Sequence, residues 1–130
     1  MPPRGIDAAT VRALVARLPE AEERSHFGHP DFRVANKIFA TLWPSEDGCN
    51  LRLPHALALE LVGGEPATFR LIAERGHIGW VGLALAHADA LALGELLTAA
   101  WRFRAPERLL DATPTPDGRR RRARRTDASA

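Results

Sequence analysis

Residues 32–53 read FRVANKIFATLWPSEDGCNLRL, and the pattern within this stretch decides the fold. Apolar and polar residues alternate in segments 32–34 and 49–53. In segment 38–43, Ile38, Ala40 and Leu42 alternate with Phe39, Thr41 and Trp43. This period of two is typical of strands with one buried face. Between the segments, Ala35-Asn36 fits a two-residue hairpin turn because asparagine tolerates positive φ, and residues 44–48 form a longer turn. The stretch therefore predicts an antiparallel meander of three strands.

The flanking sequence predicts helices and two further strands. Residues 7–18 are expected to form an amphipathic helix that starts at Asp7, because four apolar residues repeat at the spacing of one buried stripe. Residues 20–30 are polar and read as a connection. After the meander the pattern predicts, in order, a short helix, two strands and a long helix, at about 55–62, 69–72, 79–83 and 88–104. Gly79 and Gly82 in the last strand allow either close approach of another segment or strong curvature.

The resulting order of elements is helix, three strands, helix, two strands, helix. Such an order predicts an α+β fold, in which helices cover one face of an antiparallel sheet. All of these elements lie within residues 1–110, which we expect to form one domain. Residues 111–130 combine prolines, a glycine and arginines with nothing to bury, and this composition predicts a disordered, arginine-rich C-terminal tail.

The positive charge of the chain is concentrated in that tail. The sequence has 18 basic and 16 acidic residues, of which six arginines and three aspartates lie in residues 111–130. Residues 1–110 therefore hold 12 basic and 13 acidic side chains, and the domain is close to neutral. The six tail arginines are Arg119, Arg120, Arg121, Arg122, Arg124 and Arg125. A cluster of this density attracts polyanions without sequence preference.

Composition also indicates the compartment. Cys49 is the only cysteine, so the chain has no intramolecular disulfide. No apolar run approaches the roughly 18 residues that a bilayer-spanning helix needs, and the first residues lack the apolar core of a signal peptide. We therefore expect a cytoplasmic protein without membrane contact.

Catalytic motifs are absent from the pattern. None of the serines lies in a Gly-x-Ser-x-Gly elbow, and Gly63-Gly64 lacks the lysine and hydroxyl partners of a phosphate loop. Cys49 alternates with Leu51 and Leu53, which predicts a small core residue rather than a nucleophile. The sequence therefore predicts a non-enzymatic protein without a cofactor.

The segment around His26, His29 and Asp31 has the residue types of a zinc site. Structural zinc usually takes four ligands, however, and Cys49 is the only sulfur that the chain offers. A hydrogen-bonded loop that leads into the first hairpin is the favoured interpretation, with no metal.

The stretch from His26 to Ala40 resembles the signature of the MmcQ/YjbR family, whose pattern is Gly-x-Pro-x-Phe followed by valine and Lys-x-Phe-Ala. The matching residues are Gly28, Pro30, Phe32, Val34, Lys37, Phe39 and Ala40, followed later by Trp80, Leu96, Leu97 and Trp101. The resemblance covers about residues 8–110, and Asn36 stands where family members often have glycine. It implies a fold likened to type III secretion chaperones and a DNA-binding role, assigned by analogy with a double-wing arrangement of hairpins.

Several residues are candidates for contact with nucleic acid. Arg33 and Arg52 alternate with the apolar residues of their strands, so they are expected on the outer sheet face, where phosphates could bind and Trp80 could stack. For Trp80 a buried position is the favoured alternative. Lys37 is the only lysine and matches the family motif. Together with the six tail arginines, the candidates are Lys37, Arg33, Arg52, Arg75 and Trp80.

The leading hypothesis is a binding protein that contacts DNA or another polyanion non-specifically, mainly through phosphates. One alternative is a protein-partner or chaperone-like module, which an exposed apolar patch around Trp43 or Trp101 would favour. Another is a small-molecule-binding domain with a pocket near His26, His29 and Trp80. The expected assembly is a monomer or a weak homodimer.

Overall fold

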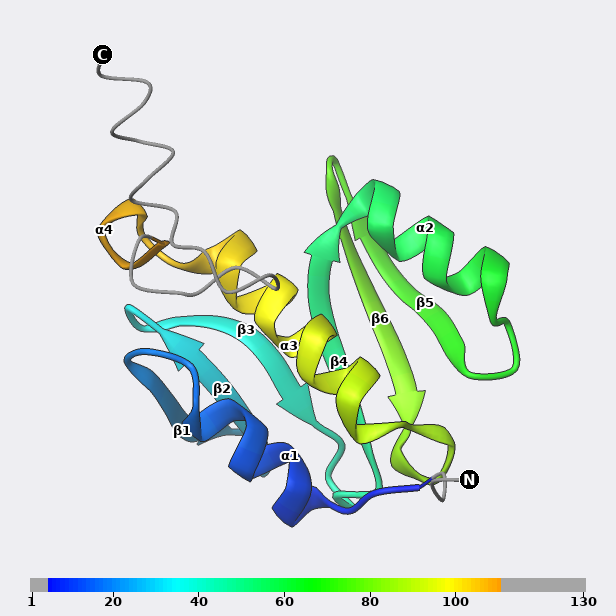
Figure 1. The fold of residues 1–130 in the computed structure, drawn as a ribbon, viewed down its shortest axis with the longest axis horizontal. Coiled ribbons are helices and arrows are strands. Elements are labelled where there is room, and N and C mark those ends of the chain that lie inside the picture. Colours follow the sequence, from blue (N-terminus) through cyan, green and yellow to red (C-terminus); the bar gives the residue numbers. More distant parts are fainter. Residues whose placement is uncertain (1–4, 111–130) are drawn as a thin grey trace.

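The computed structural model describes residues 5–110, which form an open antiparallel sheet of six strands packed with helices. The elements in chain order are α1 (Ala8–Ala16), β1 (Ala21–His26), β2 (His29–Val34), β3 (Lys37–Leu42), β4 (Gly48–Pro54), α2 (His55–Gly64), β5 (Phe69–Arg75), β6 (Ile78–Ala84), the 3-10 helix η1 (Leu85–His87), α3 (Ala90–Arg104) and α4 (Glu107–Leu110). The strand order is β1-β2-β3-β4-β6-β5 (Figure 1). The α+β class predicted from the sequence is confirmed.

The core lies between the sheet and its helices. Leu51 and Val81 are register partners on β4 and β6, and both are fully buried. Helix α3 crosses β3 and β4 with α1 beside it (Figure 1) and adds the buried Trp101 to this core. Helix α2 packs on the same face, because a Cβ added to Gly79, the partner of Leu53, would be 2.6 Å from the Cβ of Ala58. The close approach predicted at Gly79 is therefore confirmed.

The predicted polar connection at 20–30 is wrong, because residues 21–26 form a strand. Strand β1 pairs with β2 along its whole length, from the Ala21–Val34 pair to the His26–His29 pair. Its side chains are mostly exposed, since β1 is an edge strand with little of the core to cover. A strand of this kind has no apolar alternation, so no period-two pattern marks it in the sequence.

The predicted alternation fails inside β3. Phe39 and Ala40 are adjacent, and both are fully buried. The cause is a register shift: Phe32 pairs with Ala40, while the next residue of β2, Arg33, pairs with Ile38. One extra residue on β3 thus opposes β2, as in a β-bulge, and a bulge turns the following side chains by one position. The turn at Ala35-Asn36 has the positive φ that the sequence predicted.

The remaining predicted boundaries are close to those of the structure. Helix α1 ends at Ala16, and the side chain of Asp7 caps it by accepting from the Thr10 backbone N–H. Helix α2 continues through both glycines to Gly64, and β5 continues to Arg75. Within residues 5–110 no helix has the length and apolarity needed to cross a membrane.

Strand β4 pairs with its two neighbours over different lengths. All of Gly48–Pro54 pairs with β6, whereas β3 pairs only with Cys49 to Leu51. The segment from Arg52 to Pro54 therefore has no strand partner among residues 5–110 on its β3 side. In Figure 1 the last turns of α3 lie between the start of β3 and the end of β4.

Candidate functional site

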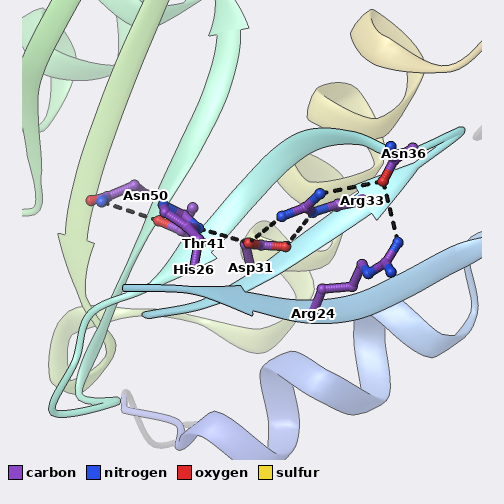
Figure 2. A network of polar contacts seen from close by, with 7 residues as sticks. All are labelled: Arg24, His26, Asp31, Arg33, Asn36, Thr41 and Asn50. Carbon is purple, nitrogen blue, oxygen red and sulfur yellow. Dashed lines mark hydrogen bonds and ion pairs between the residues drawn. The ribbon is translucent and has the colours of Figure 1, made fainter. Parts of the chain in front are cut away.

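A polar network lies on the sheet face opposite the core, and Asp31 is at its centre (Figure 2). Among residues 5–110, Asp31 is the one polar or charged residue that is fully buried. Its Oδ1 accepts from Nε of Arg33 at 2.8 Å, and its Oδ2 accepts from Nη2 of Arg33 at 3.1 Å. His26 Nδ1 lies 2.7 Å from Oδ2. A carboxylate buried with a bidentate arginine and an imidazole has its lone pairs satisfied.

These contacts set the charge state of Asp31. The hydrogen bonds from Arg33 lower the pKa of the Asp31 carboxyl below its ordinary value, burial opposes this shift, and His26 adds to it. The same ion pair raises the pKa of Arg33. Asp31 is thus a carboxylate at neutral pH, and its negative charge is neutralised within the sheet.

The network continues in two directions across the strands. At the hairpin turn, the Asn36 side-chain oxygen accepts from Arg24 and from Arg33, at 3.3 Å each (Figure 2). In the middle of the sheet, Asn50 donates to Thr41 at 3.2 Å and accepts from the Trp43 indole N–H at 2.8 Å. The arrangement holds β1 to β4 in register, which is a structural role.

Arg33 therefore lies on the outer face, as predicted, but its guanidinium is engaged by Asp31 and Asn36. The second predicted outer-face arginine, Arg52, is the register partner of Trp80. Trp80 is half-buried rather than fully buried. Because β6 is separated from β2 by β3 and β4, the structure does not bring Trp80 together with His26 and His29. The two imidazoles instead stack on one another, with centroids 5.8 Å apart.

Lys37 and Arg75 lie at one end of the sheet. Strands β3 and β6 both pair antiparallel with β4, so they run parallel to each other and begin at the same end. Lys37 starts β3 after the 35–36 turn, and Arg75 ends β5 before the turn into β6. Both side chains are exposed. We call this end, with the two turns and Arg52 between them, the hairpin end.

The YjbR family model matches residues 16–103, which is most of the described chain. The chain belongs to the YjbR family. The resemblance seen in the stretch from His26 to Ala40 is thereby confirmed.

A solved structure supports the same fold. The Deinococcus radiodurans protein DR2400, whose crystal structure is described as the family-model domain DUF419, superposes with a TM-score of 0.63 at 22% sequence identity. The match covers 72% of this chain and 74% of that chain. At this identity the likeness shows the fold alone. No curated protein matches the chain.

The cysteine and the two tryptophans that the sequence singled out lie in buried or half-buried positions of this YjbR domain. Burial raises the pKa of the Cys49 thiol to about 12, consistent with its predicted place in the core. Trp101 is fully buried and donates from its indole to the Pro19 carbonyl oxygen at 3.0 Å, while Trp43 is half-buried. No three histidine, cysteine, aspartate or glutamate side chains within residues 5–110 are placed to hold a metal ion.

Sequence reasoning missed three residues that shape the YjbR domain's polar surface. Asp31 was assigned to a loop, although its spacing of two from Arg33 is the signal of a shared strand face. Phe103 and Arg104 were assigned only to the last helix, but Phe103 lies under the guanidinium of Arg52. No local pattern could predict that contact, because it joins residues far apart in the chain. The tail arginines, Arg119 to Arg125, lie outside the described residues.

Proposed function

We propose that this YjbR-family protein is a small non-enzymatic protein that binds DNA through its phosphates. The observation that supports the proposal is the placement of Lys37 and Arg75 on two separate hairpins at the same end of the sheet. Both side chains are exposed, and neither has an ion-pair partner within residues 5–110. Cations on two projecting hairpins suit a polyanion with regularly spaced charges, and such contacts position a protein on the backbone without reading its sequence.

The tail and the domain have different parts in this proposal. The arginines at 119–125 supply a dense positive charge, and this charge attracts the phosphate backbone from a distance. The domain has nearly equal numbers of basic and acidic residues, so its attraction is local to the hairpin end. The tail then contributes most of the affinity, and the hairpin end contributes orientation.

Trp80 adds a second kind of contact. Its half-buried indole lies beside Arg52 on the outer face and presents an aromatic surface next to a cation. Aromatic rings next to cations bind single strands, since any base can stack on them. We therefore expect single-stranded DNA to bind at least as well as duplex DNA of equal length.

The test measures the affinity of the full chain for labelled DNA by fluorescence anisotropy at a series of salt concentrations. Six tail contacts would give a slope of log affinity on log salt of about −5, at about −0.9 per phosphate on a duplex. Replacement of all six tail arginines by glutamine removes that part of the slope. The double variant Lys37→Gln/Arg75→Gln reduces the slope by about 2. The control is Arg70→Gln, with an exposed arginine at the opposite end of β5 from Arg75.

Two outcomes would contradict the proposal. Absence of DNA binding by the full chain at low salt would refute it entirely. Equal slopes for the hairpin-end variant and its control would restrict binding to the tail and leave the domain without this role.

A further inference from the structure

A second basic site is found where α3 ends against β4. The guanidinium carbon of Arg52 lies 4.9 Å from the centre of the Phe103 ring. The edge of His77 meets the same ring, with centroids 6.3 Å apart and planes at 82°. Stacking on an aromatic face fixes the plane of a guanidinium and leaves its N–H donors free around the edge. Arg52 thus lies over the Phe103 ring, and this contact uses none of its N–H donors.

Among residues 5–110, no acceptor is found for the donors at this place. Arg52 has neither a hydrogen bond nor an ion pair to any side chain of residues 5–110. The Nε of Arg104 is buried, and within the same residues it has no hydrogen-bond partner. Buried donors of native proteins are nearly always satisfied, so one without a partner indicates an acceptor from elsewhere.

The charges at this place are also uncompensated. Burial lowers the pKa of Arg52, and repulsion from Arg104 lowers it further, while no carboxylate acts in the opposite direction. Glu74, the acid on the same hairpin as His77, is engaged by His55, with 2.6 Å between Nε2 and Oε1. Within residues 5–110 the two guanidinium groups repel one another and neither forms an ion pair, which is unfavourable unless an anion joins them.

We infer that Arg52 and Arg104 form a binding site for one phosphomonoester group. A phosphomonoester has two negative charges near neutral pH, which balance two guanidinium groups, and three free oxygens, which match their forked donors. The partial burial of the site favours a compact terminal group over a phosphodiester within a chain. Phe103 and Trp80 flank Arg52 and provide aromatic surface for the rest of the ligand. The site shares Arg52 with the hairpin end, but it does not use Lys37 or Arg75 and does not require that the protein bind duplex DNA.

The experiment measures phosphate binding by the full chain at constant ionic strength, by calorimetry and by thermal unfolding. The probes are inorganic phosphate and a short oligonucleotide with either a 5′-phosphate or a 5′-hydroxyl. Arg52→Gln and Arg104→Gln are expected to weaken phosphate binding about 10- to 100-fold, as expected for the loss of charge-assisted hydrogen bonds. The exposed Arg70→Gln, with the same charge change, is expected to bind as the native chain does.

Stability separates a binding role from a structural role. Without phosphate, Arg104→Gln is expected to unfold at the same temperature as the native chain or higher, because it removes a like-charge repulsion and an unsatisfied donor. With phosphate, only the native chain and Arg70→Gln are expected to gain stability. Loss of stability in Arg104→Gln without phosphate, or unchanged phosphate affinity in both site variants, would overturn the inference.

The probes also identify the source of the phosphate. Tighter binding of the 5′-phosphorylated oligonucleotide than of its 5′-hydroxyl counterpart, lost in Arg52→Gln, would assign the site to the end of a nucleic acid strand. Binding of inorganic phosphate with no difference between the two oligonucleotides would assign it to a small phosphate ester. No saturable binding of either probe would refute the site, whatever the result of the DNA experiment at varied salt.

Discussion

At the scale of single residues, Asp31 shows how the outer face is held together. A buried carboxylate is costly unless its oxygens are hydrogen-bonded and its charge is balanced. Arg33 and His26 provide both, from β2 itself and from the neighbouring strand β1. The edge of the sheet therefore depends on one acid, and a change of its charge acts on several strands at once.

We expect Asp31→Asn to lower the free energy of unfolding by about 2–3 kcal/mol, because the Arg33 guanidinium loses a charged acceptor. The folded-state pKa of Asp31 is below its ordinary value, so its contribution is present above about pH 4 and is lost as the pH falls through the folded-state pKa. Urea unfolding over a series of acidic pH values should therefore show a flatter pH dependence for Asp31→Asn. Glu60→Gln, exposed on α2, is the control. Parallel curves for the native chain and Asp31→Asn would contradict the prediction.

Phe27 is a residue that the fold itself does not explain. It lies in the β1–β2 turn at a φ of 48°, followed by Gly28 at 78°, and its side chain is 95% exposed. Asparagine is far better suited to this position of a two-residue turn than phenylalanine. We expect Phe27→Asn to raise the free energy of unfolding by about 1 kcal/mol, measured by urea unfolding. Gly28→Ala is the opposite control and should lower it. A loss of stability in Phe27→Asn would show that Phe27 packs against the fold.

At the scale of elements, the predictable part of the fold was that built on apolar alternation. Strands β2 and β4 and the stripe of α1 bury the residues that their spacing indicates. Strand β1 could not be predicted, because an edge strand forms through backbone pairing and its side chains remain outside the core. The bulge at Phe39 likewise depends on how β2 and β3 align, which no local pattern determines. For the candidate site, the outer-face positions of Arg33 and Arg52 were predictable, but their partners were not.

The contact between β6 and α2 provides a test at this scale. A Cβ at Gly79 would be 2.6 Å from the Cβ of Ala58, so the helix must move away from the sheet. We expect Gly79→Ala to lower the free energy of unfolding by about 1–3 kcal/mol in urea unfolding, as overpacked cores do. Gly63→Ala, within α2 and with no atom within 4 Å of the added Cβ, is expected to be stabilising by about 0.5–1 kcal/mol. Recovery of stability in Gly79→Ala/Ala58→Gly would confirm the mechanism, and equal effects of the two glycine substitutions would contradict it.

At the scale of the whole molecule, the sheet is open, and its two edges have charged residues. Strand β1 exposes Glu22, Glu23 and Arg24, and β5 exposes Arg70, Glu74 and Arg75. Charges along edge strands prevent pairing with a second sheet. The apolar exception is Ile72 on β5, which is 48% exposed.

We therefore expect the full chain to be a monomer in sedimentation equilibrium, with an apparent mass that does not change with concentration. Ile72→Lys is expected to leave this result unchanged, because the surrounding charges already block edge pairing. A dimer of the native chain that Ile72→Lys abolishes would contradict the prediction and assign the β5 edge as the interface.

The short pairing of β3 with β4 has a consequence for how the molecule opens. Three residue pairs connect β1-β2-β3 with β4-β6-β5, from Ala40–Leu51 to Leu42–Cys49. The sheet thus consists of two three-stranded halves joined by a narrow hinge, the β3–β4 pairing, and α3 lies across both halves. In hydrogen exchange we expect the amides of this hinge to exchange before those between β4 and β6, because fewer bonds must break together. A ligand bound at the end of α3 would stabilise the contacts of α3 with β3 and β4 and slow amide exchange between these two strands. The exchange rate in the middle of the sheet would therefore reveal whether a ligand is bound.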